Sequence, residues 1–139
     1  MEKAVYSVII PVFNRPEELR ELLESLSKQT FQAFEVIVID DGSDLDAAEV
    51  AASFTGKLQI RYYYKKNSGP GPSRNYGCTL AASSFFVFFD SDCIVPPSYF
   101  EHLHRQMLTH DIQAFGGPDE ASHDFTLIQK AISYSMTSV

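Results

Sequence analysis

Cysteine and long hydrophobic runs are both scarce in this sequence, and each shortage argues against a class of protein. The two cysteines, Cys78 and Cys93, lack the spacing of a metal-binding motif. We therefore expect no disulfide framework and a reducing, cytoplasmic compartment. The apolar run near the N-terminus is too short for a signal sequence, and no run is long enough to cross a bilayer. The sequence accordingly predicts no transmembrane segment in this chain.

Positive charge is scarce as well. Lys and Arg together number 11, whereas Asp and Glu number 18, which gives a net charge of −7. Binding to a nucleic-acid backbone needs clustered cations, so we expect no nucleic-acid partner. The excess of carboxylates instead fits a site that prefers cations.

The chain has short apolar runs that alternate with amphipathic stretches, and its 139 residues fit a single domain with a core. Short apolar runs predict strands at residues 4–10 (closed by Pro11), 34–40, 58–64, 85–89 and 112–117. Hydrophobic periodicity predicts helices at residues 16–29, 43–54 (capped by Ser43 or Asp44), from about Ser73 to 82, 97–109 and 124–136. This alternation indicates an α/β fold, a mainly parallel sheet with helices on both faces in a three-layer sandwich. Apolar runs such as FEVIVI and FFVFF should be buried on both faces.

In such a fold, ligands bind beyond the carboxyl ends of the strands. Asp90 and Asp92 directly follow the apolar residues 85–89. In an extended chain their side chains would point the same way, roughly 7 Å apart. Two such carboxylates repel each other unless a cation lies between them, and Mg²⁺ or Mn²⁺ suits such a pair. The alternative is that both are turn residues or helix caps before Pro96.

Two other strand ends carry polar groups. Asp40 and Asp41 follow the second strand, where a carboxylate can accept hydrogen bonds from a ribose or a base. The same residues also predict a tight turn with Gly42 at positive φ, and the turn and the contact can both be present. The glycine-rich residues 67–75 open a helix that carries Arg74, which favours anion binding, although a plain loop with Arg74 in a structural ion pair is also possible.

Phe13 and Asn14 follow the first strand. An aromatic ring at the rim of a cleft can stack on a nucleobase, and the alternative is that Phe13 packs in the core.

Together, the segments SVIIPVFNRP, VIVIDDGS, NSGPGPSRNYG and FFVFFDSDCIVP resemble the nucleotide-binding half of family 2 glycosyltransferases, which have the Rossmann-like GT-A fold. The resemblance implies that Pro11 and Phe13 line the base site and that Asp40 contacts the base. It implies that Arg74 and Asn75 lie near the nucleotide. The full set of expected nucleotide-binding residues is Pro11, Phe13, Asn14, Asp40, Asp41, Arg74, Asn75 and Asp90. Asp90 and Asp92 match the Asp-x-Asp metal motif of the family, and Asp92 is the expected direct ligand of Mn²⁺ or Mg²⁺.

The resemblance also implies an inverting transfer from a nucleotide-diphosphate sugar, most often a UDP-sugar, to an acceptor hydroxyl. The catalytic base of the family lies later in the chain than Val139, and we identify no catalytic residue here. We therefore expect residues 1–139 to be a single, C-terminally truncated GT-A domain that binds the donor and is inactive alone. The acceptor, whether glycan, lipid carrier or protein, stays open, as does attachment of a longer protein to the inner face of the membrane.

Two other enzyme classes use a metal at an α/β cleft. A phosphatase of the haloacid dehalogenase type would use Asp90 as its nucleophile, but its motif normally ends the first strand rather than the fourth. A nucleotidyltransferase needs a Gly-rich basic loop after the first strand, and residues 11–16 are not such a loop. A non-catalytic binding module is the remaining alternative.

Overall fold

The computed structural model describes residues 3–116. Of these residues, those up to His104 belong to one compact unit and those from Arg105 to a second. The sheet and the candidate site both lie in the first unit. No helix among the described residues is both long and apolar enough to span a membrane.

The first unit is built on a sheet of four parallel strands. The strands are β1 (Tyr6–Val12), β2 (Phe34–Asp40), β3 (Gln59–Tyr64) and β4 (Phe86–Phe88). Their order across the sheet is β3-β2-β1-β4, with β1 and β2 in the centre. The chain therefore moves outward from β1 to β3 and then crosses to the opposite edge for β4, so the strand order switches beside β1.

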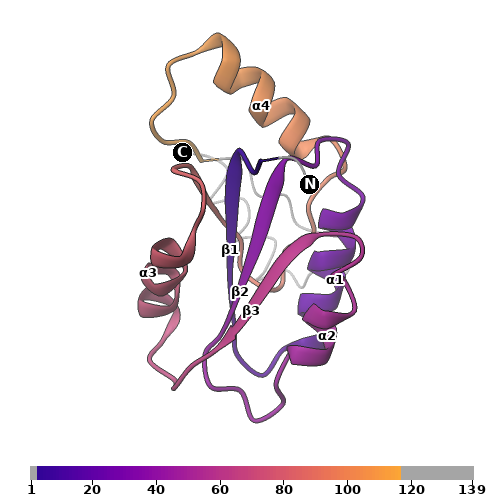
Figure 1. Ribbon diagram of the computed structural model, residues 1–139, viewed down its shortest axis with the longest axis vertical. Coiled ribbons are helices and arrows are strands. Elements are labelled where there is room, and N and C mark those ends of the chain that lie inside the picture. The colour runs from indigo at the N-terminus through magenta and orange to yellow at the C-terminus, as the bar shows by residue number, and fades with distance from the viewer. Residues whose placement is uncertain (1–2, 117–139) are drawn as a thin grey trace, which may run out of the picture. The chain divides into compact units, whose positions relative to one another are not determined.

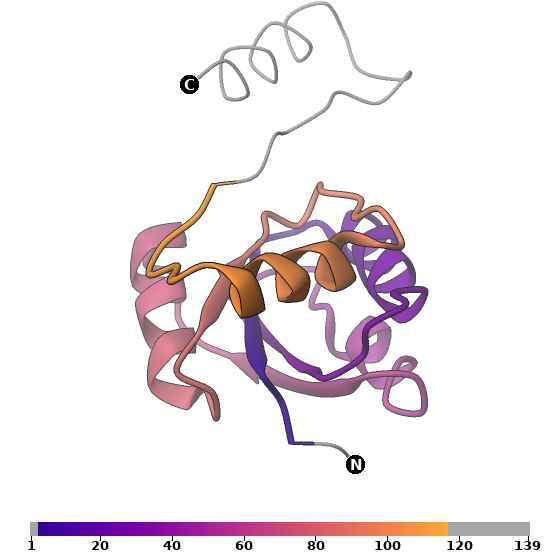
Figure 2. The ribbon, with the colours of Figure 1, turned by 90° about the horizontal axis from the view of Figure 1, so that it is seen from above.

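Helices cover both faces of this sheet. They are α1 (Pro16–Ser27), α2 (Ala48–Ala52) and α3 (Pro70–Leu80). The fourth helix, α4 (Tyr99–Thr109), follows β4 in the chain. Figure 1 shows α1 and α2 on one side of the strands and α3 on the other, and Figure 2 shows the same layers from above. The α/β fold with helices on both faces is confirmed.

The core follows from the apolar runs of the strands and the helical period of α1. All residues of β2 are buried, as are all those of β1 except Pro11. Helix α1 begins with a proline at its first position and turns four leucines inward, at residues 19, 22, 23 and 26. Phe100 of α4 stacks on Phe34 at the amino end of the sheet, with ring centroids 4.5 Å apart. The carboxyl ends of the strands are left for the loops.

The sequence predicted that Pro11 closes the first strand. Strand β1 instead continues through Pro11 to Val12. Ser7 donates its backbone N–H to Phe85 O, on the β4 side of β1, at 2.9 Å. Because alternate residues of a strand point their N–H groups the same way, the nitrogen of Pro11 also faces that side. Pairing with β4 ends at Ile9, which lies opposite Phe88. Pro11 lies beyond this point, so the sheet does not need an N–H donor there.

The predicted helix over residues 43–54 is shorter than expected. It begins at Ala48 with Ala47 as its N-cap, so the prediction of a cap at Ser43 or Asp44 is wrong. The Asp40 carboxylate accepts the N–H groups of Ser43 and Ala47, and Asn14 Oδ1 accepts the two N–H groups that follow Ser43. Asp40 at the end of β2 and Asn14 from the β1–α1 loop thus hold residues 43–47 outside the helix.

Three other predictions need correction. Helix α3 begins at Pro70 rather than near Ser73, with Gly69 at a φ of 98° as its N-cap. Strand β4 is not buried on both faces, because Phe86 and Phe88 are exposed and only Val87 between them is buried. Residues 112–116 form no strand. The helix predicted at residues 124–136 lies outside the described residues.

Candidate functional site

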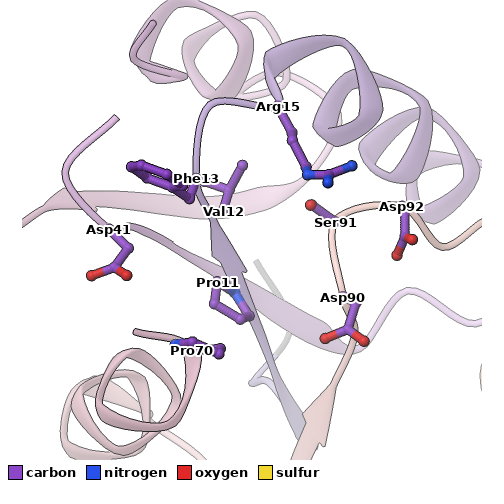
Figure 3. A pocket seen from close by; sticks show the side chains of 9 residues that line it. All are labelled: Pro11, Val12, Phe13, Arg15, Asp41, Pro70, Asp90, Ser91 and Asp92. Atoms are coloured by element: carbon purple, nitrogen blue, oxygen red, sulfur yellow. The ribbon is translucent and has the colours of Figure 1, made fainter. Parts of the chain in front are cut away.

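A cavity of about 310 Å³ lies at the carboxyl ends of β1, β2 and β4, where the strand order switches. Pro11 and Val12 line it from the end of β1, and Phe13 and Arg15 line it from the β1–α1 loop. Asp41 lines it from the position after β2. Pro70 and residues 90–92 complete the lining. In Figure 3, Phe13 and Asp41 lie on one side of the cavity, and Asp90 and Asp92 lie on the other.

Phe13 and Asn14 have different positions in this site. Phe13 is 46% exposed and lines the cavity, so the alternative of a core aromatic does not hold. Asn14 does not line the cavity. Its φ of 53° is left-handed, a conformation that Asn tolerates, and its backbone N–H donates to Ser43 Oγ at 2.8 Å. Asn14 thus ties the β1–α1 loop to the loop after β2 and holds Phe13 at the rim.

Asp40 points into the protein rather than into the cavity. It is fully buried, and its Oδ2 accepts hydrogen bonds from Ala47 N (3.1 Å) and the Tyr62 hydroxyl (2.6 Å). Burial, reinforced by the Asp40 carboxylate, raises the pKa of Tyr62 above its ordinary value, so the phenol stays protonated and donates. In this structure Asp40 organises the loop after β2, and its contact with a nucleobase stays a prediction.

Asp41 is also buried, yet it lines the cavity. Its carboxylate accepts the backbone N–H groups of Ser68 and Gly69, each at 2.9 Å, and pairs with Lys65 Nζ. Burial by itself raises the pKa of Asp41, but the bonds from Lys65, Ser68 and Gly69 outweigh it and hold the pKa below its usual value. Asp41 is therefore an ionised anchor for the loop between β3 and α3.

Gly42 supplies the positive φ of the tight turn after Asp41, as the sequence predicted. Its φ is 80°, and a Cβ there would lie 2.8 Å from Asn67 N. The turn and the β3–α3 loop therefore approach each other at a distance that only glycine permits.

The pair Asp90 and Asp92 lies in a turn and not in extended chain. Cys93 N donates to Asp90 O at 3.1 Å, so the prediction that strand geometry aligns the two side chains is wrong. Both nevertheless line the same cavity. Asp90 Oδ1 accepts a hydrogen bond from Arg74 Nη2 at 2.8 Å, whereas Asp92 has no hydrogen-bond or ion-pair partner among residues 3–116.

Arg74 reaches the site from α3. Neither it nor Asn75, which is exposed, lines the cavity, but Arg74 is joined to the site through its ion pair with Asp90. The structural ion pair considered from the sequence is thus present, and it lies at the expected binding edge.

The carboxylates of Asp90 and Asp92 fit a hard divalent cation that binds few protein ligands. Among the described residues, no group of three or more His, Cys, Asp and Glu side chains could hold a metal ion. Asp90 and Asp92 offer carboxylate oxygens only, which suits Mg²⁺ or Mn²⁺ bound through one or two protein ligands, with water and phosphate as the others. A cage made by protein ligands alone does not fit.

Sequence reasoning missed four lining residues: Val12, Arg15, Pro70 and Ser91. The available signal for Arg15 was its position between the first strand and Pro16, which begins α1. A residue at that point of a βα unit lies at the carboxyl edge of the sheet.

Comparison with known proteins identifies the family. The family model described as glycosyl transferase family 2 matches residues 7–138. An uncharacterized glycosyltransferase of Rickettsia felis is 44% identical over 86 residues, which is 62% of this chain and 14% of that protein. The uncharacterized glycosyltransferase YibD of Escherichia coli is 35% identical over 107 residues, which is 76% of this chain and 31% of that protein. The chain thus spans less than half the length of these relatives.

Solved structures agree with this result. The structure of S. aureus TarS 1-349 in complex with UDP-GlcNAc matches with a TM-score of 0.74 at 28% identity, over 95% of this chain and 42% of that one. The mannosyltransferase PcManGT of Pyrobaculum calidifontis, in complex with GDP-Man and Mn²⁺, matches with a TM-score of 0.62 at 20% identity, over 69% of this chain and 30% of that one, which shows a shared fold. The sequence match covers most of the chain, and the chain therefore belongs to glycosyl transferase family 2.

Proposed function

We propose that this chain is the donor-binding part of an inverting glycosyltransferase and that it binds a nucleotide-diphosphate sugar in the cavity beside β1. The observation that carries the proposal is the cavity itself, which combines an exposed aromatic ring, Phe13, with the acidic turn at Asp90 and Asp92. An aromatic platform and a carboxylate pair on opposite sides of one cavity suit the two ends of a nucleoside diphosphate.

The roles follow from the position of each side chain. Phe13 stacks on the base, and Pro11 lines the floor beneath it. Asp41 holds the β3–α3 loop against the base side of the cavity, and it does so as an ionised carboxylate. Arg74 holds Asp90 in place through their ion pair.

Asp92 is the proposed ligand of a divalent cation, because no described side chain pairs with it. Mn²⁺ or Mg²⁺, when bound, would offset the negative charge of the diphosphate and so favour its departure. Asp90 is the second candidate ligand, and its ion pair with Arg74 limits how freely it can turn toward a cation.

UDP is the proposed nucleotide. TarS, at 28% identity, has been solved with UDP and with UDP-GlcNAc, which supports a UDP-sugar without identifying the sugar. The reaction proposed for the whole protein is attack of an acceptor hydroxyl on the anomeric carbon, after a carboxylate base removes its proton. The family match does not favour a phosphatase or a nucleotidyltransferase.

Titration calorimetry tests this proposal. UDP, GDP and dTDP are titrated into the chain with Mn²⁺ present and again with a chelator. We expect UDP to bind most tightly and the chelator to weaken it. If none of the three nucleotides binds under either condition, the proposed function is wrong.

A further inference from the structure

The cavity has an uneven balance of charge. Three carboxylates line it, and Arg15 is the one cation among its lining residues. Asp41 is already paired with Lys65, and Asp90 with Arg74, from outside the lining. An anionic ligand that enters this cavity therefore meets a single lining cation, at residue 15.

The Arg15 side chain is oriented but only partly used. Its Nη1 donates to both carboxylate oxygens of Glu18, at 2.9 and 3.0 Å. Among residues 3–116, no partner takes its other N–H groups. Figure 3 shows the guanidinium extending toward the side of the cavity where Ser91 and Asp92 lie, away from Asp41. Glu18 thus fixes one nitrogen and leaves the remaining donors available to a ligand.

We propose that Arg15 binds phosphate oxygens of the nucleotide and that Glu18 positions it for this contact. This inference rests on the proposed function and adds a residue to it that the family motifs do not assign. A guanidinium matches phosphate with paired N–H donors and stays charged at all relevant pH values. Its place beside the acidic turn puts it where the diphosphate would lie if the base stacks on Phe13.

A purely structural role explains Arg15 less well. Its described interaction is a surface ion pair with Glu18, at 57% and 39% side-chain exposure, and such pairs contribute little to stability. The fold therefore gains little from an arginine at this position. Substitution should leave folding intact, which makes binding measurements on the variant interpretable.

The test compares Arg15→Gln with Arg20→Gln. Arg20 is the matched control, because it lies on α1, pairs with Glu17 at i,i+3 and does not line this cavity. Calorimetric titrations with UDP and with uridine are run in Mn²⁺ and in chelator. We expect Arg15→Gln to weaken UDP binding about tenfold or more, the range for loss of a charge-assisted hydrogen bond, and to leave uridine binding within about twofold. Arg15→Lys should recover part of the loss.

The chelator separates Arg15 from the metal ligand. The loss in Arg15→Gln should persist in chelator, because the guanidinium contacts phosphate directly. Unchanged UDP affinity in Arg15→Gln, or an equal loss of affinity for UDP and for uridine, would overturn this inference. If the wild-type chain still binds UDP, the proposed function stands in either case. Failure of the wild-type chain to bind any nucleotide would overturn both.

Discussion

At the scale of single residues, two adjacent carboxylates, Asp40 and Asp41, each hold a different loop in place. Asp40 ends β2 and Asp41 follows it, and both are buried. Asp40 accepts hydrogen bonds from the segment that leads into α2, whereas Asp41 accepts them from the segment that leads into α3. The loops on either side of the cavity are therefore set by neighbouring side chains, and each carboxylate can be tested by itself.

Asp40→Asn should destabilise the fold. The amide replaces one acceptor oxygen by a donor, so at least one of Ser43 N, Ala47 N and the Tyr62 hydroxyl loses its partner. An unsatisfied buried donor costs about 1–3 kcal/mol, and we expect the free energy of unfolding to fall by that amount. Urea unfolding measures the change.

The control for this experiment is Asp44→Asn, because Asp44 is exposed. Its effect should stay within about 0.5 kcal/mol of the wild type. Equal unfolding midpoints for the two variants would mean that Asp40 does not anchor the loop.

Asp41 should make stability depend on pH. The pKa of Asp41 lies below its ordinary value in the folded protein, so its ionised form stabilises the fold at pH values above the unfolded pKa of about 3.9. This contribution is lost as the pH falls from there through the lower, folded pKa. Unfolding midpoints of the wild type and of Asp41→Asn should therefore differ most near neutral pH and converge below about pH 4. A gap that stays constant with pH would contradict this assignment.

At the scale of elements, the close approach of α3 to the sheet sets where Arg74 lies. Gly77 is the point of contact, because a Cβ there would lie 2.5 Å from Ile9 Cγ2 on β1. The side chain of a buried isoleucine has little room to move, so a larger residue would push the helix outward. Arg74, one turn earlier on α3, would move with it.

Gly77→Ala is therefore expected to destabilise the fold by about 1–3 kcal/mol through overpacking and to weaken nucleotide binding. Gly71→Ala is the matched control on the same helix, because a Cβ at that position would have no atom within 4 Å, and alanine there should be neutral or stabilising. Chemical unfolding of both variants measures the difference. Equal stability of the two would show that α3 can shift freely on the sheet.

At the scale of the whole molecule, local patterns predicted the fold but not the boundaries of its elements. Short apolar runs and the 3.6-residue period located every described strand and helix, since such patterns depend on neighbouring residues. Helix α2 was predicted too long because side chains outside it take up the N–H groups before it: Asn14, about thirty residues away, and Asp40, which turns back from the end of β2. Residues 112–116 had the pattern of a strand, but a strand also needs a partner, which no local pattern supplies.

The candidate site was predicted in part for the same reason. Asp90 and Asp92 could be found because they follow an apolar strand, and the cavity does include them. Three other features depend on the directions of side chains. Asp40 turns inward, Arg74 pairs with Asp90, and Arg15 lines the cavity. Such directions are set by tertiary packing and cannot be read from spacing.

The central claim is that a divalent cation held by Asp92 joins the nucleotide to this cavity. The most direct measurement is the ratio of UDP affinities in Mn²⁺ and in chelator, for the wild type and for Asp92→Asn, with Asp44→Asn as the exposed control. We predict a gain of about tenfold or more from Mn²⁺ in the wild type and the control, equivalent to ~1.4 kcal/mol, and almost none in Asp92→Asn. An Asp92→Asn chain that keeps the full gain from Mn²⁺ would contradict the account.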